Sequence, residues 1–119
     1  MRKKVAKDNG FAGTWHIYKM ETWDADYFNM EVRAYVKIGS KNTGDFQFGL
    51  VHGEIDGRVV ECCGERRLEF TWDGNDEYDP VSGSGWAKIM KKDLEGEIRI
   101  HRGDSSLFWA RKAKVGSAF

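Results

Sequence analysis

The pattern in this chain that most suggests chemistry is a histidine followed at alternate positions by carboxylates: His52, Glu54 and Asp56. In a strand, His52 and Glu54 lie on the same face, and a carboxylate beside an imidazole can orient it as a general base. No serine or cysteine is recognisably paired with them, so the pattern lacks the nucleophile that covalent catalysis requires. An enzyme that uses His52 and Glu54 is therefore one hypothesis, ranked below two binding hypotheses.

A second cluster of side chains that could bind a ligand is acidic and spans residues 73–79. It contains Asp73, Asn75, Asp76, Glu77 and Asp79, whose oxygens are of the type that calcium prefers. The spacing resembles an EF-hand loop only in part, because the glycine stands at the second position and no glutamate stands at the twelfth. Since Asp, Asn and Gly also favour turns, the sequence favours a solvated loop. A cationic ligand or a partner protein at Asp76 and Glu77 is the alternative.

Histidine and cysteine spacing predicts no metal site and no cofactor. The three histidines lack H-x-H or H-E-x-x-H spacing, although a metal or haem ligand at His52 stays an alternative. Cys62 and Cys63 are adjacent, so in a strand they point to opposite faces and are poorly placed for a disulfide. Cysteines outside a disulfide framework are typical of a reducing cytoplasm.

Composition narrows the classes of partner. The 119 residues are enough for one domain, and 19 Lys and Arg balance 19 Asp and Glu. This balance argues against nucleic-acid binding by phosphate neutralisation, and the basic run at 2–4 is expected to be a solvated tail. The N-terminal stretch has no apolar region typical of a secretory signal, and no window approaches the roughly 18 apolar residues of a membrane span. The sequence predicts a cytoplasmic protein whose partners are neither nucleic acid nor membrane.

Alternation of apolar and polar residues predicts eight strands that must position these side chains. They cover residues 13–19, 33–38, 45–54, 58–63, 67–73, 86–90, 94–101 and 106–112. The Asp56-Gly57 pair predicts a hairpin turn, and short connections favour antiparallel strands in sequential order. Eight such strands can close and remove the exposed sheet edges. The predicted fold is all-β, a single antiparallel up-and-down eight-stranded barrel at 13–112, with tails at 1–12 and 113–119.

One segment between the first two strands has helical periodicity. Within residues 21–31, Trp23, Tyr27 and Met30 fall at i, i+4 and i+7 and would share one face of a helix. Thr22 is the expected N-cap. The sequence therefore predicts a short helix or helical loop after strand one.

The run Gly-Thr-Trp at 13–15 resembles the opening of lipocalins and fatty-acid-binding proteins, the calycin group. The resemblance implies that Trp15 packs at the closed end of the barrel, that Arg111 of the last strand lies across it, and that the helix acts as a lid. The chain lacks the lipocalin Thr-Asp-Tyr motif, has fewer strands than fatty-acid-binding proteins and offers no clear inward arginine. Several of its segments also resemble small uncharacterised bacterial proteins, which implies no activity.

Two binding hypotheses follow from the predicted barrel. In the first, a small, partly apolar or aromatic ligand occupies the interior, against Phe46, Phe48, Trp72 and Trp86. His52 would orient this ligand, since the alternation places it on the face of Phe46, Phe48 and Leu50, and Trp23 and Tyr27 would cover the mouth. Further wall residues of the cavity would be Leu50 and Phe70.

In the second hypothesis the interior is filled by side chains, as is common in small barrels. The protein would then be a structural or interaction module that contacts partners through exposed aromatic residues, Tyr18 and Trp109, and through the acidic loop. A net charge of zero favours self-association, so a homo-oligomer is an expected partner state.

Overall fold

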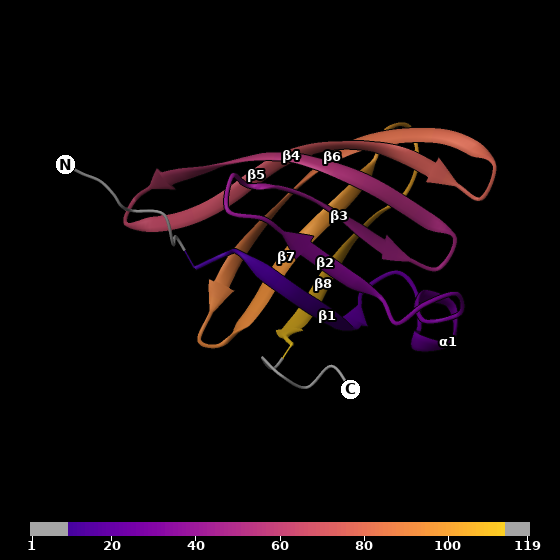
Figure 1. Ribbon diagram of the computed structural model, residues 1–119, viewed down its shortest axis with the longest axis horizontal. Coiled ribbons are helices and arrows are strands. Elements are labelled where there is room, and N and C mark those ends of the chain that lie inside the picture. The colour runs from indigo at the N-terminus through magenta and orange to yellow at the C-terminus, as the bar shows by residue number, and fades with distance from the viewer. Residues whose placement is uncertain (1–9, 114–119) are drawn as a thin grey trace.

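The computed structural model describes residues 10–113 and shows a closed barrel of eight antiparallel strands in sequential order. Each strand pairs with the next along the chain, and β8 closes the barrel by pairing with β1 (Figure 1). This confirms the predicted fold class. The predicted tails and the basic run at 2–4 fall mainly on residues 1–9 and 114–119, which lie outside the described residues. The elements are β1 (Gly13–Met20), α1 (Ala25–Phe28), β2 (Tyr35–Ile38), β3 (Thr43–Phe48), β4 (Val51–Cys62), β5 (Glu65–Asp76), β6 (Asp79–Met90), β7 (Asp93–Ile100) and β8 (Ser105–Lys112).

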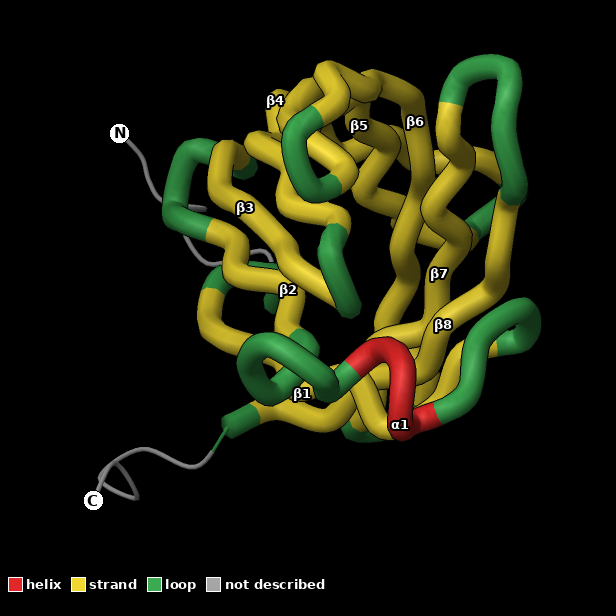
Figure 2. The backbone as a smooth tube through the Cα atoms, turned by 90° about the vertical axis from the view of Figure 1, so that its right-hand side faces the viewer, coloured by secondary structure: helices red, strands yellow, loops and turns green. Residues whose placement is uncertain are grey.

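The two ends of the barrel differ. One end, here called the helix end, carries α1 and the turns at 49–50, 77–78 and 101–104 (Figure 2). The other end carries the turns at 39–42, 63–64 and 91–92. No helix in residues 10–113 is long and apolar enough to cross a membrane.

Aromatic rings fill the middle of the barrel. Phe46 lies 5.9 Å from Phe48 and 5.0 Å from Trp72, measured between ring centroids, and the second pair meets edge to face. All three side chains are at most 3% exposed. Such ring pairs add about 0.5–1.5 kcal/mol each to the gain from burial.

Glycines at inward positions make room for these rings. A Cβ on Gly53 would lie 2.7 Å from Phe46 Cζ and 2.6 Å from Trp72 Cε3. On β6 and β7, a Cβ on Gly85 would lie 2.5 Å from Phe70 Cζ, and one on Gly96 would lie 2.7 Å from Phe108 Cε2. The rings therefore occupy the space that inward side chains of β4, β6 and β7 would otherwise fill.

The predicted hairpin at Asp56-Gly57 is wrong, because the chain turns earlier, at 49–50. Phe48 pairs with Val51 across a two-residue loop, and Gly49 has a φ of 57°, a left-handed conformation that glycine adopts most readily. The Tyr27 ring packs where a Cβ on Gly49 would lie. β4 then continues unbroken through Gly57, so the strand count is correct although this boundary is not.

The predicted acidic loop at 73–79 is also wrong. β5 continues to Asp76 and β6 begins at Asp79, leaving a two-residue turn in which Glu77 has a φ of 58°. Asp76 and Asp79 are paired across the hairpin. The polar residues of this segment are explained by exposure of both faces of the hairpin. Its strands remain paired through the backbone although neither face is buried.

The helical segment is shorter than the predicted range of 21–31. α1 covers four residues, and Asp24 rather than Thr22 caps it by accepting a hydrogen bond from the Tyr27 amide. Thr22 instead donates to the Ser105 carbonyl on β8. Of the predicted stripe, Trp23 and Tyr27 are half-buried against the core, whereas Met30 is 52% exposed. Phe28, which lies outside the stripe, is buried.

Trp15 closes the end opposite the helix. It is buried, and its indole Nε1 donates to the Phe11 carbonyl at 2.9 Å. Phe11 lies in the predicted N-terminal tail, yet it is only 1% exposed. The cation over the indole is Lys112, with Nζ 5.3 Å from the ring centroid. The predicted Arg111 is displaced by one residue of register and stacks on Tyr18 instead.

We expect Gly53→Ala to lower the free energy of unfolding by about 1–3 kcal/mol, because its Cβ would enter the space of two rings. Urea unfolding measures the change. Gly39→Ala is the control, since its Cβ would approach only the Thr43 carbonyl oxygen, at 3.2 Å, and should cost less. Adding Phe46→Leu to Gly53→Ala should cost less than the sum of the single changes. Additive effects would mean that the Phe46 ring is not the obstacle.

Candidate functional site

The residues predicted to line an interior ligand cavity separate into two groups. Phe46, Phe48 and Trp72 face inward and are buried among one another. Trp23 and Tyr27 are half-buried at the helix end, where the Trp23 ring lies 4.9 Å from Phe48. These five side chains form one continuous packed cluster.

The predicted inward orientation is wrong for His52 and Trp86. The turn at 49–50 reverses the alternation, so that Val51, Gly53 and Ile55 face inward and the His52 side chain is 40% exposed on the outer wall. Leu50 lies in the turn itself.

Trp86 is outside because glycine and alanine take the inward positions on either side of it. Its indole Nε1 donates to Glu97 Oε1 at 3.2 Å, and the Arg67 guanidinium stacks on the ring with 4.1 Å to the centroid. Its polar and aromatic groups therefore already have partners within the chain.

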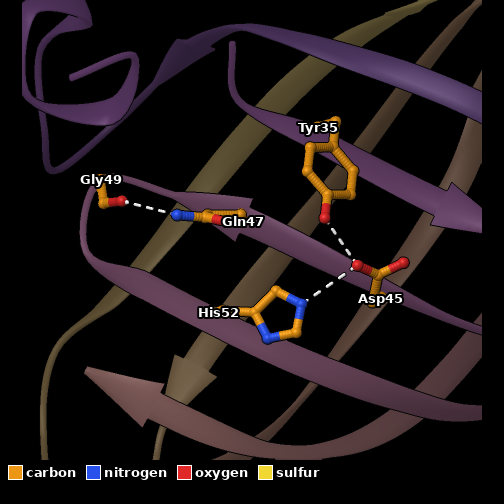
Figure 3. Close-up of polar contacts among 5 residues, drawn as sticks. All are labelled: Tyr35, Asp45, Gln47, Gly49 and His52. Atoms are coloured by element: carbon orange, nitrogen blue, oxygen red, sulfur yellow. Dashed lines mark hydrogen bonds and ion pairs between the residues drawn. The ribbon is translucent and has the colours of Figure 1, made fainter. Parts of the chain in front are cut away.

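His52 belongs to a polar cluster on the outer faces of β2, β3 and β4 (Figure 3). The Tyr35 hydroxyl donates to Asp45 Oδ2 at 2.6 Å, and His52 Nε2 lies 3.1 Å from the same oxygen. Because an ionised carboxylate only accepts hydrogen bonds, His52 Nε2 carries the proton, and Nδ1 is the acceptor in the neutral ring. The cluster therefore holds the imidazole in one tautomer at the surface.

The Tyr35 phenol is the group whose ionisation this cluster changes most. Burial, with the hydrogen bond and negative charge of Asp45, raises the pKa of Tyr35 to about 12. The phenol therefore remains a donor to Asp45 at any pH near neutrality.

The two other histidines lie elsewhere. His101 is exposed. His16 is half-buried, and its burial, followed by the positive charge of Arg33, lowers its pKa.

The cluster is part of a longer polar surface, which we call the outer polar strip and define as Lys37, Asp45, His52, Glu54, Asp73 and Asn75. Two open depressions of about 610 and 500 Å³ follow this strip, and His52 and Glu54 line both. Cross-strand register places Asp45 beside Glu54 and Glu54 beside Asp73. Three carboxylates thus face solvent across β3, β4 and β5, against one lysine on β2.

The carboxylate that contacts the His52 ring is Asp45, whereas the sequence pattern predicted Glu54 for this position. Within residues 10–113 the side-chain partner of the His52 ring is the Asp45 carboxylate, and no hydroxyl or thiol is hydrogen-bonded to it. In the same range no group of three or more His, Cys, Asp or Glu is arranged to hold a metal ion. The strip presents hydrogen-bonding groups and negative charge on an open surface.

Sequence reasoning missed Tyr35 and Asp45 because it placed His52 on the opposite side of the sheet. The signal was the glycine of Phe48-Gly49-Leu50, which can turn the chain as well as Asp56-Gly57 can. A turn there would have put Asp45 and His52 on one face.

The chain matches no family model, and comparisons with curated proteins and with solved structures give no match. The site is therefore interpreted from its own geometry.

We expect the free energy of unfolding to fall as the pH rises from 10 towards 12, because the folded protein holds the Tyr35 proton more tightly than an unfolded chain with a pKa near 10.0. Tyr35→Phe should remove this component, together with the tyrosinate absorbance that develops near pH 12. Denaturant unfolding at several alkaline pH values and an ultraviolet titration measure the two effects. Tyr78→Phe is the control, since Tyr78 is 89% exposed; an equal effect in both variants would contradict the assignment.

Proposed function

We propose that this protein is a non-enzymatic binding module that contacts its partner through the outer polar strip. The observation that carries this proposal is the filled interior, in which Phe46, Phe48 and Trp72 contact one another and press on inward glycines. An interior ligand would require these rings to move apart. The outer wall needs no rearrangement to be contacted.

The charge of the strip favours a cationic partner. Its carboxylates, Asp45, Glu54 and Asp73, outnumber its one lysine, and its depressions are open to solvent. A small molecule lying there would leave much of its surface in water, whereas small-molecule sites usually bury most of their ligand. A basic segment of another protein, with Lys or Arg side chains spaced along it, can follow the strip across several strands.

Self-association through Tyr18 and Trp109 has less support. The Arg111 guanidinium lies 4.3 Å from the Tyr18 ring centroid, and Lys19 Nζ lies 5.0 Å from that of Trp109. One face of each ring therefore has a partner within the same chain.

The barrel plan supports a further, broader assignment to the calycin group, through Trp15 at the closed end and a basic residue of β8 above it. A cytoplasmic location belongs to the same proposal, because the exposed thiol of Cys63 suits a reducing compartment.

We expect Glu54→Lys with Asp73→Lys to weaken the binding of a ten-residue lysine peptide by at least about tenfold, equivalent to about 1.4 kcal/mol. Fluorescence anisotropy at fixed low salt measures the affinity, since screening would otherwise mask it. Glu31→Lys with Glu61→Lys is the control, with the same change of net charge on exposed residues away from the strip. Equal weakening in both variants would mean that only overall charge attracts the peptide, and would contradict the proposal.

Native mass spectrometry of protein purified from its own host, beside a denatured sample, tests the filled interior. We expect no small apolar molecule to be released on denaturation. A co-purifying apolar ligand that is lost when Phe48→Glu is introduced into a folded barrel would instead support the interior-ligand hypothesis.

A further inference from the structure

A second polar depression, of opposite charge to the outer polar strip, lies at the helix end of the barrel. It has a volume of about 610 Å³ and is built from β6, β7, the start of β8 and the turn at 101–104. We call it the basic depression. Its lining is Ser82, Gly83, Ser84, Arg99, Ile100, His101, Arg102, Gly103 and Ser105. Two arginines, a histidine and three serines thus line it, and no carboxylate does.

The sheet register isolates Arg99 from acidic partners. Arg99 pairs with Ser84 on β6 and with Ser105 on β8. Two other cationic residues of the same strands stand opposite carboxylates: Lys88 opposite Glu95 and Arg111 opposite Asp93. Arg99 is therefore an exposed cation between two hydroxyls, which is an arrangement that attracts an anion rather than neutralising the charge within the chain.

Neither arginine of the basic depression is engaged within residues 10–113. The structure gives Arg99 and Arg102 no ion pair, no side-chain hydrogen bond and no ring contact there, whereas Arg67 and Arg111 both stack on aromatic rings. The carboxylates nearest in sequence are Glu97 for Arg99 and Asp104 for Arg102; neither lines the depression, and Glu97 accepts a hydrogen bond from the Trp86 indole. Both guanidiniums are available to a ligand.

The turn that carries His101 and Arg102 is held in place by backbone contacts. The His101 amide donates to the Ser82 carbonyl at 2.7 Å, and the Ile100 amide donates to the Asp104 carbonyl at 2.9 Å. Arg102 adopts a left-handed φ of 63° inside this turn. The backbone of the turn is therefore held in place before any ligand arrives, which lowers the cost of ordering this backbone on binding.

Gly83 contributes bare backbone to the lining. Behind it, the indole Nε1 of Trp72 is buried with no hydrogen-bond acceptor in the described part of the chain, and a Cβ on Gly83 would lie 3.0 Å from it.

We propose that the basic depression binds the phosphate group of a small phosphorylated molecule. Guanidinium groups form paired hydrogen bonds with phosphate oxygens, and the serine hydroxyls can donate to further oxygens. A phosphate monoester carries more charge and more acceptor oxygens than a carboxylate, so it can use the donors on β6, β7 and β8 together. The depression is open to solvent, so the contact that we propose is with the phosphate group, and the rest of the molecule can remain in water.

The test is a titration with phenyl phosphate, inorganic phosphate and benzoate at constant ionic strength, followed by amide chemical shifts in the nuclear magnetic resonance spectrum. We expect phenyl phosphate to shift residues 82–84 and 99–105 and to bind more tightly than benzoate. Equal affinity for phenyl phosphate and inorganic phosphate would assign free phosphate as the ligand, while tighter phenyl phosphate would assign an ester.

Arg99→Ala with Arg102→Ala should weaken phenyl phosphate binding at least about tenfold. Arg33→Ala with Arg58→Ala removes the same charge from exposed arginines elsewhere and should change the affinity less than about twofold. Arg99→Lys with Arg102→Lys should give an intermediate loss, because lysine keeps the charge without the paired donors.

Three results of the phosphate titrations would overturn the proposal. They are shifts that do not localise to 82–84 and 99–105, equal loss in the two arginine pairs, and binding of phenyl phosphate no tighter than that of benzoate. Self-association that disappears in Arg99→Ala with Arg102→Ala, without any phosphate effect, would assign the depression to a second copy of the chain and would also overturn it.

Discussion

The fit between inward aromatic rings and inward glycines is the constraint on which the rest of the barrel depends. Eight strands leave an interior only just wide enough for side chains, and here Phe46, Phe70 and Trp72 fill it because facing positions carry no Cβ. A larger residue at Gly53 or Gly85 would have to displace a ring. Because these rings occupy the interior, both surfaces that we propose for binding lie on the outside of the barrel.

On the outer wall, acidic and basic residues are gathered on different surfaces, which the neutral composition does not reveal. The chain is neutral overall, yet the outer polar strip is acidic and the basic depression carries Arg99 and Arg102. The two surfaces adjoin, because Ser82 lines the basic depression and also one of the depressions of the strip. The protein is therefore neutral overall but has a dipolar surface. Such a surface orients an approaching charged molecule instead of attracting it uniformly.

Strand existence, strand number and closure could be predicted from the sequence because alternation survives in nearly every strand. The burial of β5 alternates as its sequence does, with Leu68, Phe70 and Trp72 inside. The turn at 49–50 could not be located with the same reliability. Gly49 and Gly57 are the same residue type, and they differ in the side chains that pack on them, which the sequence does not reveal. That boundary decides on which face of the sheet His52 lies. Because the predicted turn was placed too late, the contact between His52 and Asp45 could not be predicted. The hairpin at 73–79 was predicted to be a loop for a related reason. A run of polar residues indicates that a segment is exposed, but it does not indicate whether the backbone is paired.

The pairing of β1 with β8 has a consequence for how the chain acquires its structure. Most of its strand pairs join neighbours in sequence and can form by local hairpin closure, but Trp15 meets Lys112 only when nearly the whole barrel is in place. Contacts between distant residues slow folding, since a long loop must be ordered before they form. During synthesis β1 therefore waits with one edge unpaired, and this edge is the part of the nascent chain most exposed to mispairing with another molecule.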